Sequence, residues 1–288
     1  MSSLDLRGPS ADALAALSER LSPAKGIVPT VTRLAARVTG GEADTDMARM
    51  GEDLYGVATL LRSEPGLRRV ATDVSTDPEA KSRLFRQILD GKVSGPARDL
   101  VTDAVQRRWT RTRDLADALE HLAVVAIVDS AGDASDQLSD ELFAVGQLID
   151  EQPEVRTALS DPTRSNEDKS RLLRALLEGK TLPATQRLAE LALTGSHRSF
   201  SVAIEEYQKV AADAHGQRVA EVRVAHELSS TDIERLQAAL SNQYGRTVHL
   251  NVVVDPEILG GMRVEIGDDV IDGTVSGRID DARRRLAG

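Results

Sequence analysis

The chain of 288 residues is long enough for two domains that each bury a core of their own. Acidic residues outnumber basic residues, 46 to 36, and the net charge of −10 offers no basic face for the phosphates of a nucleic acid, so we expect no nucleic-acid partner. The absence of cysteine excludes a disulfide framework, a thiolate zinc site and a cysteine nucleophile, and it is typical of a protein of the reducing cytoplasm.

Nothing in the sequence predicts that the chain enters a membrane by itself. The longest wholly apolar run, residues 122–128, is far shorter than the roughly 20 residues that a spanning helix needs. The first residues, MSSLD, lack the basic segment and the apolar core of a signal peptide. We therefore expect any membrane association to come through a partner.

Apolar residues recur at intervals of three and four along most of the chain, which predicts helices packed on one another. Ser10 is the expected N-cap of the first helix, and Gly40-Gly41 is expected to separate the second helix from the third. Pro65 and Pro153 are expected to end helices. In chain order, the main helices predicted before residue 216 are 11–20, 31–38, 47–61, 81–89, 97–105, 115–128, 169–177, 184–193 and 202–214.

Part of this helical region is duplicated in the sequence. Residues 81–92, KSRLFRQILDGK, return as residues 169–180, KSRLLRALLEGK, and further residues match at the same spacing of 88 positions without a gap. Each segment predicts a helix that ends at a Gly-Lys pair. The apolar pattern of these helices predicts that Leu84 and Leu172 face the cores of two similar bundles.

The first copy, residues 1–130, and the second copy, residues 131–216, are not equivalent throughout. The long helix at 115–128 is more aliphatic than its counterpart at 202–214. We therefore expect the first of these helices to be enclosed on more sides, by a neighbour in an assembly, and we expect the two copies to have unequal roles.

After Gly216 the apolar pattern changes from the period of a helix to that of a strand. Residues 219–225 and 248–254 alternate as strands do, and a helix that begins near Ser229 or Thr231 lies between them. A third strand at 262–266 and a final helix at 275–286 complete a small mixed domain of order β-α-β-β-α over residues 217–288. The predicted fold class is therefore α+β, with two helical bundles before this domain.

One segment resembles a phosphate-binding loop, Gly179-Lys180-Thr181. A nucleotide P-loop requires another glycine five residues before the Gly-Lys pair, where this chain has Arg174 inside a helical pattern. The pattern therefore favours a helix C-cap. The five histidines show no metal-ligand spacing and no catalytic pattern with serine and a carboxylate, so we assign no catalytic, cofactor-binding or metal-binding residue.

Two further motifs near the C-terminus also favour structural explanations. Asp268-Asp269 with Asp272 lacks the alternating ligands of a calcium loop and is expected to form a tight turn followed by a helix N-cap. Gly260-Gly261 precedes a strand, so it is not a dinucleotide-binding fingerprint, and it is expected to form a hairpin or bulge that needs positive φ.

Residues 250–279, LNVVVDPEILGGMRVEIGDDVIDGTVSGRI, resemble the end of the delta subunit of the bacterial rotary ATP synthase, a relative of the mitochondrial oligomycin-sensitivity-conferring protein. Residues 227–229 and 244–248 also fit that family, and residues 8–17 are loosely similar to its first helix. The chain resembles the longer form with a duplicated helical region. The signature residues, to which we assign a structural role, are Gly260, Gly261, Val264, Asp269, Asp272 and Gly273.

The resemblance implies a non-catalytic subunit of the peripheral stalk, or stator. Its expected partners are the N-terminal helices of the alpha subunits and the C-terminal helix of the b-type stalk subunit, at the cytoplasmic face of the bacterial membrane. The main alternative is a helical scaffold that binds amphipathic peptides and is unrelated to ATP synthase. A hydrolase or transferase is the third hypothesis, although no nucleophile, base or metal cluster is recognisable. Co-purification with alpha and b-type subunits distinguishes the first two.

Overall fold

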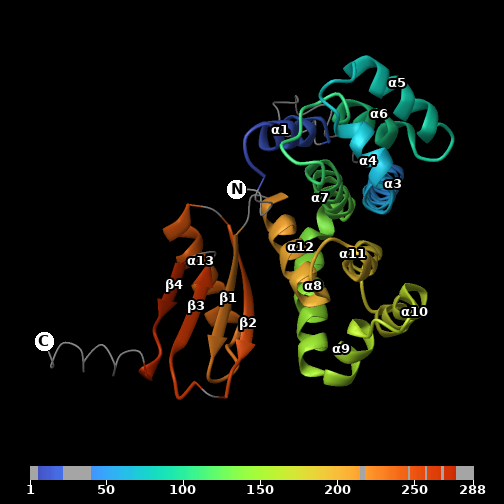
Figure 1. Ribbon diagram of the computed structural model, residues 1–288. Coiled ribbons are helices and arrows are strands. Elements are labelled where there is room, and N and C mark those ends of the chain that lie inside the picture. Colours follow the sequence, from blue (N-terminus) through green and yellow to red (C-terminus); the bar gives the residue numbers. More distant parts are fainter. Residues whose placement is uncertain are drawn as a thin grey trace, which may run out of the picture. The chain divides into compact units, whose positions relative to one another are not determined.

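The computed structural model describes residues 6–21, 40–214, 218–245, 247–256, 258–266 and 269–276 (Figure 1). The chain divides into two compact units, Met1–Val210 and Ala211–Gly288. The first is helical and the second contains a small mixed sheet, so the predicted α+β class is confirmed. Over the described residues, no helix combines the length and the apolarity needed to cross a membrane.

Most of the described helices lie close to predicted ones, but the helices at Pro65–Thr72 and Pro153–Ser160 were not predicted, and the helix at Ser135–Glu151 was expected only through its end at Pro153. Before residue 215 the described helices are α1 (Pro9–Leu21), α3 (Gly40–Ser63), α4 (Pro65–Thr72), α5 (Pro78–Leu89), α6 (Gly95–Ala104), α7 (Asp114–Asp129), the short 3-10 helix η2 (Gly132–Ala134), α8 (Ser135–Glu151), α9 (Pro153–Ser160), α10 (Asn166–Leu177), α11 (Pro183–Thr194) and α12 (Phe200–Ala214). The predicted helix at 31–38 lies outside the described residues.

Two local expectations in this region are wrong. Gly40-Gly41 does not precede a helix but forms the first two residues of α3. Ser10 lies inside α1 and is not its cap: its hydroxyl donates to Asp114 at 2.7 Å and accepts from the backbone N–H of Thr110 at 2.8 Å. The serine therefore joins α1 to the start of α7.

Prolines and caps explain why the helices begin where they do. Pro65 and Pro153 follow the ends of α3 and α8 as expected, and each is also the first residue of a new helix, where a missing N–H costs nothing. Gly91 and Gly179 follow α5 and α10 with φ of 67° and 71°, a conformation that favours glycine. The second glycine belongs to the segment that resembles a P-loop, and it lies where a helix C-cap was predicted.

The two sequence copies have matching elements. The bounds of α4 and α9, and those of α5 and α10, are separated by the 88 positions of the sequence repeat. A side-chain contact is repeated as well. Asp53 on α3 accepts a hydrogen bond from the backbone N–H of Ser94 at 2.7 Å, and Glu141 on α8 accepts one from that of Leu182 at 2.7 Å.

The core face of the repeated helix differs from the prediction. Leu84 is 40% exposed, whereas Phe85 and Leu89 are buried. The second copy shows the same shift, since Leu172 is half-buried and Leu173 and Leu177 are buried. Residues 81, 85 and 89 share one helix face and residues 84 and 88 share another, so the i, i+4 spacing alone allows either face to be buried, and the fold buries the face that carries Phe85. On that face the ammonium group of Lys81 donates to the carbonyls of Ala71 and Asp73, at 3.4 and 3.1 Å.

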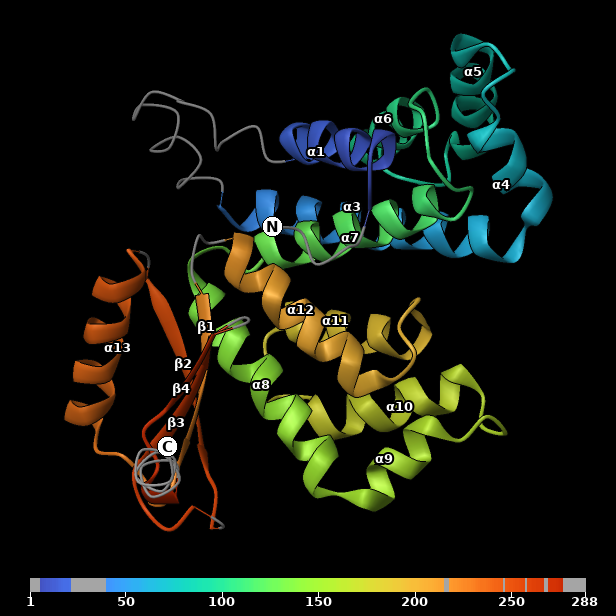
Figure 2. The same cartoon turned by 60° about the vertical axis from the view of Figure 1, so that its left-hand side comes forward.

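Helix α7 is enclosed by helices of its own chain. Twelve of its 16 residues are buried, and it packs against α1 and α3 from the first copy and against α8 and α11 from the second. Figure 2 shows α7 beside α3 along its length. At Gly51 of α3 an added Cβ would lie 2.6 Å from Ile127, so the glycine permits this close approach. The enclosure was predicted, but a neighbour in an assembly is not needed to explain it.

The second unit contains four strands in the order β2-β1-β3-β4. They are β1 (Arg218–Val224), β2 (Val248–Val254), β3 (Met262–Ile266) and β4 (Asp269–Asp272), with α13 (Ser230–Tyr244) between β1 and β2. Strands β1 and β2 are parallel and the other pairs are antiparallel. The alternate residues Ala220, Val222 and Val224 of β1 form the core with Leu240 of α13 and with Val248, Val264 and Ile266.

The sequence did not predict strand β4. Its four residues, Asp269-Val270-Ile271-Asp272, are all exposed, so no alternation of burial marks it. Asp269 itself is the first residue of β4 and pairs with Ile266, and the two residues between them, 267 and 268, lie outside the described residues, so the expected tight turn there stays a prediction. Of the two residues expected to begin α13, Ser229 is the N-cap, and its hydroxyl accepts a hydrogen bond from the backbone N–H of Asp232 at 3.2 Å. Of the final predicted helix, only its start near Val275 lies within the described residues.

Candidate functional site

A buried cluster of polar side chains lies where the two helical copies meet. Arg62 on α3 forms ion pairs with Glu120 and, at 3.0 Å, with Asp117, both on α7. Glu120 is only 3% exposed, and it also accepts hydrogen bonds from the backbone N–H of Ser196 at 3.1 and 3.3 Å. Burial alone lowers the pKa of Arg62, but the negative charges of Glu120 and Asp117 outweigh burial and raise this pKa above its ordinary value.

Helix α3 of the first copy is also joined directly to α11 of the second. The hydroxyl of Tyr55 donates to the carbonyl of Leu191 at 3.0 Å and lies 2.7 Å from the hydroxyl of Thr194. Burial raises the pKa of Tyr55 to about 12. Glu52 and Arg187 form an ion pair at 2.5 Å nearer the surface. These contacts and the shared helix α7 hold the two copies together as one helical body.

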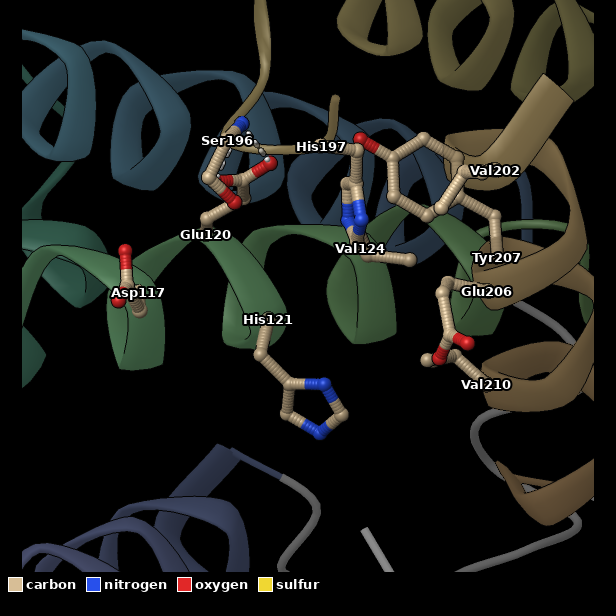
Figure 3. A pocket seen from close by; sticks show the side chains of 10 residues that line it. All are labelled: Asp117, Glu120, His121, Val124, Ser196, His197, Val202, Glu206, Tyr207 and Val210. Carbon is tan, nitrogen blue, oxygen red and sulfur yellow. Dashed lines mark hydrogen bonds between the residues drawn. The ribbon is translucent and has the colours of Figure 1, made fainter. Parts of the chain in front are cut away.

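A small cavity of about 290 Å³ lies beside this cluster, between α7 and α12 (Figure 3). The ring of His197 meets that of Tyr207 edge-on, with centroids 5.7 Å apart. Tyr207 is 2% exposed, its hydroxyl has no hydrogen-bond partner among the described residues, and burial raises its pKa. Gly195 permits this packing, because an added Cβ would lie 2.5 Å from a carboxylate oxygen of Glu120.

This cavity lacks the arrangement of a reaction centre. Its histidines, His121 and His197, lie near Asp117, Glu120 and Glu206, but no described group of three or more metal-ligating side chains is placed to hold an ion. Its volume is at the lower limit of small-molecule pockets. The segment that resembles a P-loop lies elsewhere, after α10, where the ammonium group of Lys180 donates to the carbonyl of Leu176 at 3.1 Å. That contact belongs to a helix terminus.

The six signature residues lie in and beside strands β3 and β4. Gly261 has φ of 84°, and an added Cβ would lie 2.4 Å from the carbonyl oxygen of Gly273. Two backbone hydrogen bonds hold this crossing, from Gly273 to Met262 and from Val275 to Gly260, both at 2.9 Å. The two segments approach so closely that only glycine fits at position 261.

The remaining signature residues support the same crossing. Val264 is buried in the core of the sheet, and Asp269 begins β4. The carboxylate of Asp272 accepts from the hydroxyl of Thr274 at 2.6 Å and from its backbone N–H at 2.9 Å. These hydrogen bonds, the first one foremost, hold the pKa of Asp272 below its ordinary value. The signature residues thus form a closed corner of the second unit.

Sequence reasoning missed the buried cluster. A signal for it was present, because Glu120 lies among the leucines and alanines of a helix predicted to be enclosed, and a carboxylate in such a place requires a partner. The partner could not be identified, since Arg62 is one of many arginines and lies far away in sequence. Tyr55 and Tyr207 gave no pattern at all.

The fold and these sites define a structural and binding protein, with a helical body of two joined copies and a small mixed unit closed by a glycine crossing. Residues 122–286, more than half of the chain, match the family model described as ATP synthase delta (OSCP) subunit. The chain therefore belongs to this family. It is a non-catalytic subunit of ATP synthase in the peripheral stalk, and the alternative of an unrelated scaffold is wrong.

Curated relatives match over nearly their full lengths. The chain is 59% identical over 261 residues to the ATP synthase subunit delta of Nocardioides sp. (strain ATCC BAA-499 / JS614). This alignment covers 88% of this chain and 95% of the relative. It is 40% identical over 285 residues to that of Streptomyces coelicolor, covering 98% of both. A chain in a solved structure of the Toxoplasma gondii mitochondrial ATP synthase overlaps 57% of this chain and 95% of its own length, at 17% identity and a TM-score of 0.34, too loosely to carry an argument.

Proposed function

We propose that this subunit links the catalytic head of ATP synthase to the b-type stalk, so that the head stays still while the rotor turns. The helical unit holds N-terminal helices of the alpha subunits, and the second unit holds the C-terminal helix of the b-type subunit. The family membership, with 95% of a 59% identical relative covered, is the observation that carries this proposal.

The helical unit has the mechanical properties that a stator needs. A link under torque must not bend between its attachment points, and here the two helical copies are joined by the hydrogen bond from the backbone N–H of Ser196 to the buried carboxylate of Glu120 and by direct contacts from α3 to α11. Several attachment surfaces of modest area can together give tight binding through avidity. Both features suit a linker better than a protein with a single ligand pocket.

The second unit offers apolar side chains to a partner helix. A helix that lays its apolar face on a protein surface needs exposed apolar residues there. Leu259 is 82% exposed and lies next to the glycine crossing, where Val275 is 43% exposed. The other exposed large apolar residues of this unit are Val254, Val270 and Ile271.

The boundaries that we propose give three functional parts: residues 1–130, 131–216 and 217–288. The family model begins at residue 122, inside α7, so it matches the second copy and the mixed unit and leaves α1 to α6 outside. We therefore assign the alpha-subunit helices to the second copy. Within the complex, the subunit lies at the cytoplasmic face of the bacterial membrane and reaches that membrane only through its partners.

Binding of two synthetic peptides to the full chain tests the division of labour. One peptide comes from the N-terminus of the alpha subunit and the other from the C-terminus of the b-type subunit of the same organism. Calorimetry should detect both peptides on one chain at the same time. The variant Leu259→Asp should weaken binding of the b-type peptide and leave the alpha peptide unchanged, whereas Val74→Asp, at an exposed position of the first copy, should affect neither. Failure of both peptides to bind would refute the proposal.

A further inference from the structure

We propose that helix α5 of the first copy carries a binding surface for an acidic amphipathic segment of a partner protein. The surface consists of Arg83, Leu84, Arg86 and Gln87, and we call it the α5 surface. It lies outside the residues that the family model matches, and the proposed contacts with the alpha and b-type subunits do not use it, so the proposal goes beyond the proposed function.

The α5 surface combines an exposed leucine with two unpaired cations. Leu84 is 40% exposed and does not belong to the core of the bundle, which Phe85 and Leu89 occupy from the same helix. Arg83 and Arg86 are exposed, and neither forms an ion pair with another described residue, although Glu79 lies one turn before Arg83. The fold of the chain therefore makes no use of these three side chains.

The second copy contains the same cations, but there they are neutralised within the chain. Arg171, the counterpart of Arg83, pairs with Asp168 at 3.2 Å and with Glu167 at 3.8 Å. Arg174, the counterpart of Arg86, forms a bidentate pair with Glu190, with N–O distances of 2.5 and 2.9 Å. Because the charges and N–H donors of these guanidinium groups are already engaged within the chain, few remain to bind a partner.

The difference between the copies comes from two residues. At the spacing of 88 positions, Asp168 corresponds to Ala80 and Glu190 corresponds to Thr102. The first copy thus lacks two of the three carboxylates that pair with the arginines in the second copy, and it keeps the arginines. The third, Glu167, is kept as Glu79, which forms no ion pair with Arg83. In a chain with a net charge of −10, this leaves a local basic surface.

The chemistry of the surface indicates its occupant. Guanidinium groups bind carboxylates in planar, bidentate geometry, and an exposed leucine between them favours an apolar contact. A helix with a row of leucines flanked by glutamates offers both. A membrane is less well matched, because helices that lie on membranes expose several large apolar residues, and on α5 the aromatic residue Phe85 points into the core.

The test uses the full chain and a defined probe, a synthetic peptide of about 18 residues, since shorter helices are marginal in water. Its leucine row is flanked by glutamates, and a matched peptide has glutamines instead. Because the chain has no cysteine, one fluorophore can be attached through Gln87→Cys and, in a separate protein, through Ala175→Cys at the matching position of α10. The glutamate peptide should change fluorescence at position 87 and leave position 175 unchanged.

Variants then test the charges. The double variant Arg83→Gln/Arg86→Gln should weaken binding about tenfold, as expected for the loss of two exposed charge contacts, and Arg171→Gln/Arg174→Gln should not change it. Removing the two carboxylates of the second copy, with Asp168→Ala/Glu190→Thr, should create a second site and raise the stoichiometry from one peptide to two.

Four results would overturn the proposal: no binding of the glutamate peptide, equal binding of the glutamine peptide, equal responses at positions 87 and 175, or binding of anionic phospholipid vesicles through the α5 surface. Circular dichroism of each variant confirms that its helices are intact, and exposed substitutions of this kind are expected to leave the fold unchanged.

Discussion

Replacing Arg62 by alanine should destabilise the helical unit where α3 packs on α7. The substitution leaves the carboxylate of Glu120 buried, with the backbone N–H of Ser196 as its remaining strong donor. An unpaired buried charge is costly because the protein interior solvates it poorly. The free energy of unfolding of the helical unit should therefore fall by much more than the loss of a surface ion pair would predict.

The exposed fractions of the two side chains set the magnitude. The side chain of Glu120 is 4% exposed and that of Arg62 is 25% exposed. Breaking a fully buried pair from one side costs about 3 to 5 kcal/mol, and an exposed pair contributes about 1 kcal/mol or less. Because Arg62 is partly hydrated and Ser196 still donates, we expect a cost of about 3 kcal/mol, at the lower end of the buried range.

The assay can use the single tryptophan of the chain. Trp109 is buried in the core that includes the first copy, and its indole N–H donates to the carbonyl of Ala104 at 2.9 Å, so its fluorescence reports unfolding there. Urea unfolding of Arg62→Ala is compared with that of Arg20→Ala, which removes a 2.7 Å ion pair to Asp103 from a side chain that is 53% exposed. Equal destabilisation by the two variants would refute the reasoning.

Other predictions concern the core, the glycine crossing and pH. Urea unfolding should show that Phe85→Ala destabilises the helical unit by about 3 to 5 kcal/mol and Leu84→Ala by about 0.5 kcal/mol or less. The reverse order would mean that Leu84 lies on the core face, as the sequence predicted. Gly261→Ala should lower the free energy of unfolding of the second unit by about 2 kcal/mol or more and speed hydrogen exchange in β3. Gly66→Ala, whose new Cβ would have no atom near it, should have neither effect. The neutral hydroxyl of Tyr55 contributes stability that is present below pH 10 and is lost as the pH rises toward 12, so Tyr55→Phe should flatten the alkaline decline in unfolding free energy; an unchanged decline would contradict this.

The sequence predicted most of the helices because their limits depend on local chemistry. The glycines after α5 and α10, the serine before α13 and the prolines after α3 and α8 act within a few residues of themselves. The short helices α4 and α9, which begin at those prolines, were not predicted. Strands β2 and β3 alternated clearly and were placed at their observed bounds. Strand β4 was missed because its pairing with β3 depends on a partner, while its own residues are all exposed.

The errors within helices have a different cause. In α5, Leu84 and Phe85 are both apolar, so periodicity alone allows two core faces, and the packing of α5 on the rest of the bundle decides between them. The aliphatic character of α7 indicated enclosure correctly, but not that the second copy of the same chain supplies part of it. The pair of Arg62 and Glu120 depends on the packing of α3 on α7, and the cavity at Tyr207 depends on the placement of α12 beside α7. Neither could be predicted before the helices were placed in space.

The most direct test of the stator function measures coupling in inverted membrane vesicles from cells that lack this subunit. These vesicles should show no ATP-driven proton pumping, and addition of the purified full chain should restore pumping, because the chain would then hold the head against the torque of the rotor. The chain alone should hydrolyse no ATP. Full proton pumping in the absence of the chain would contradict the account.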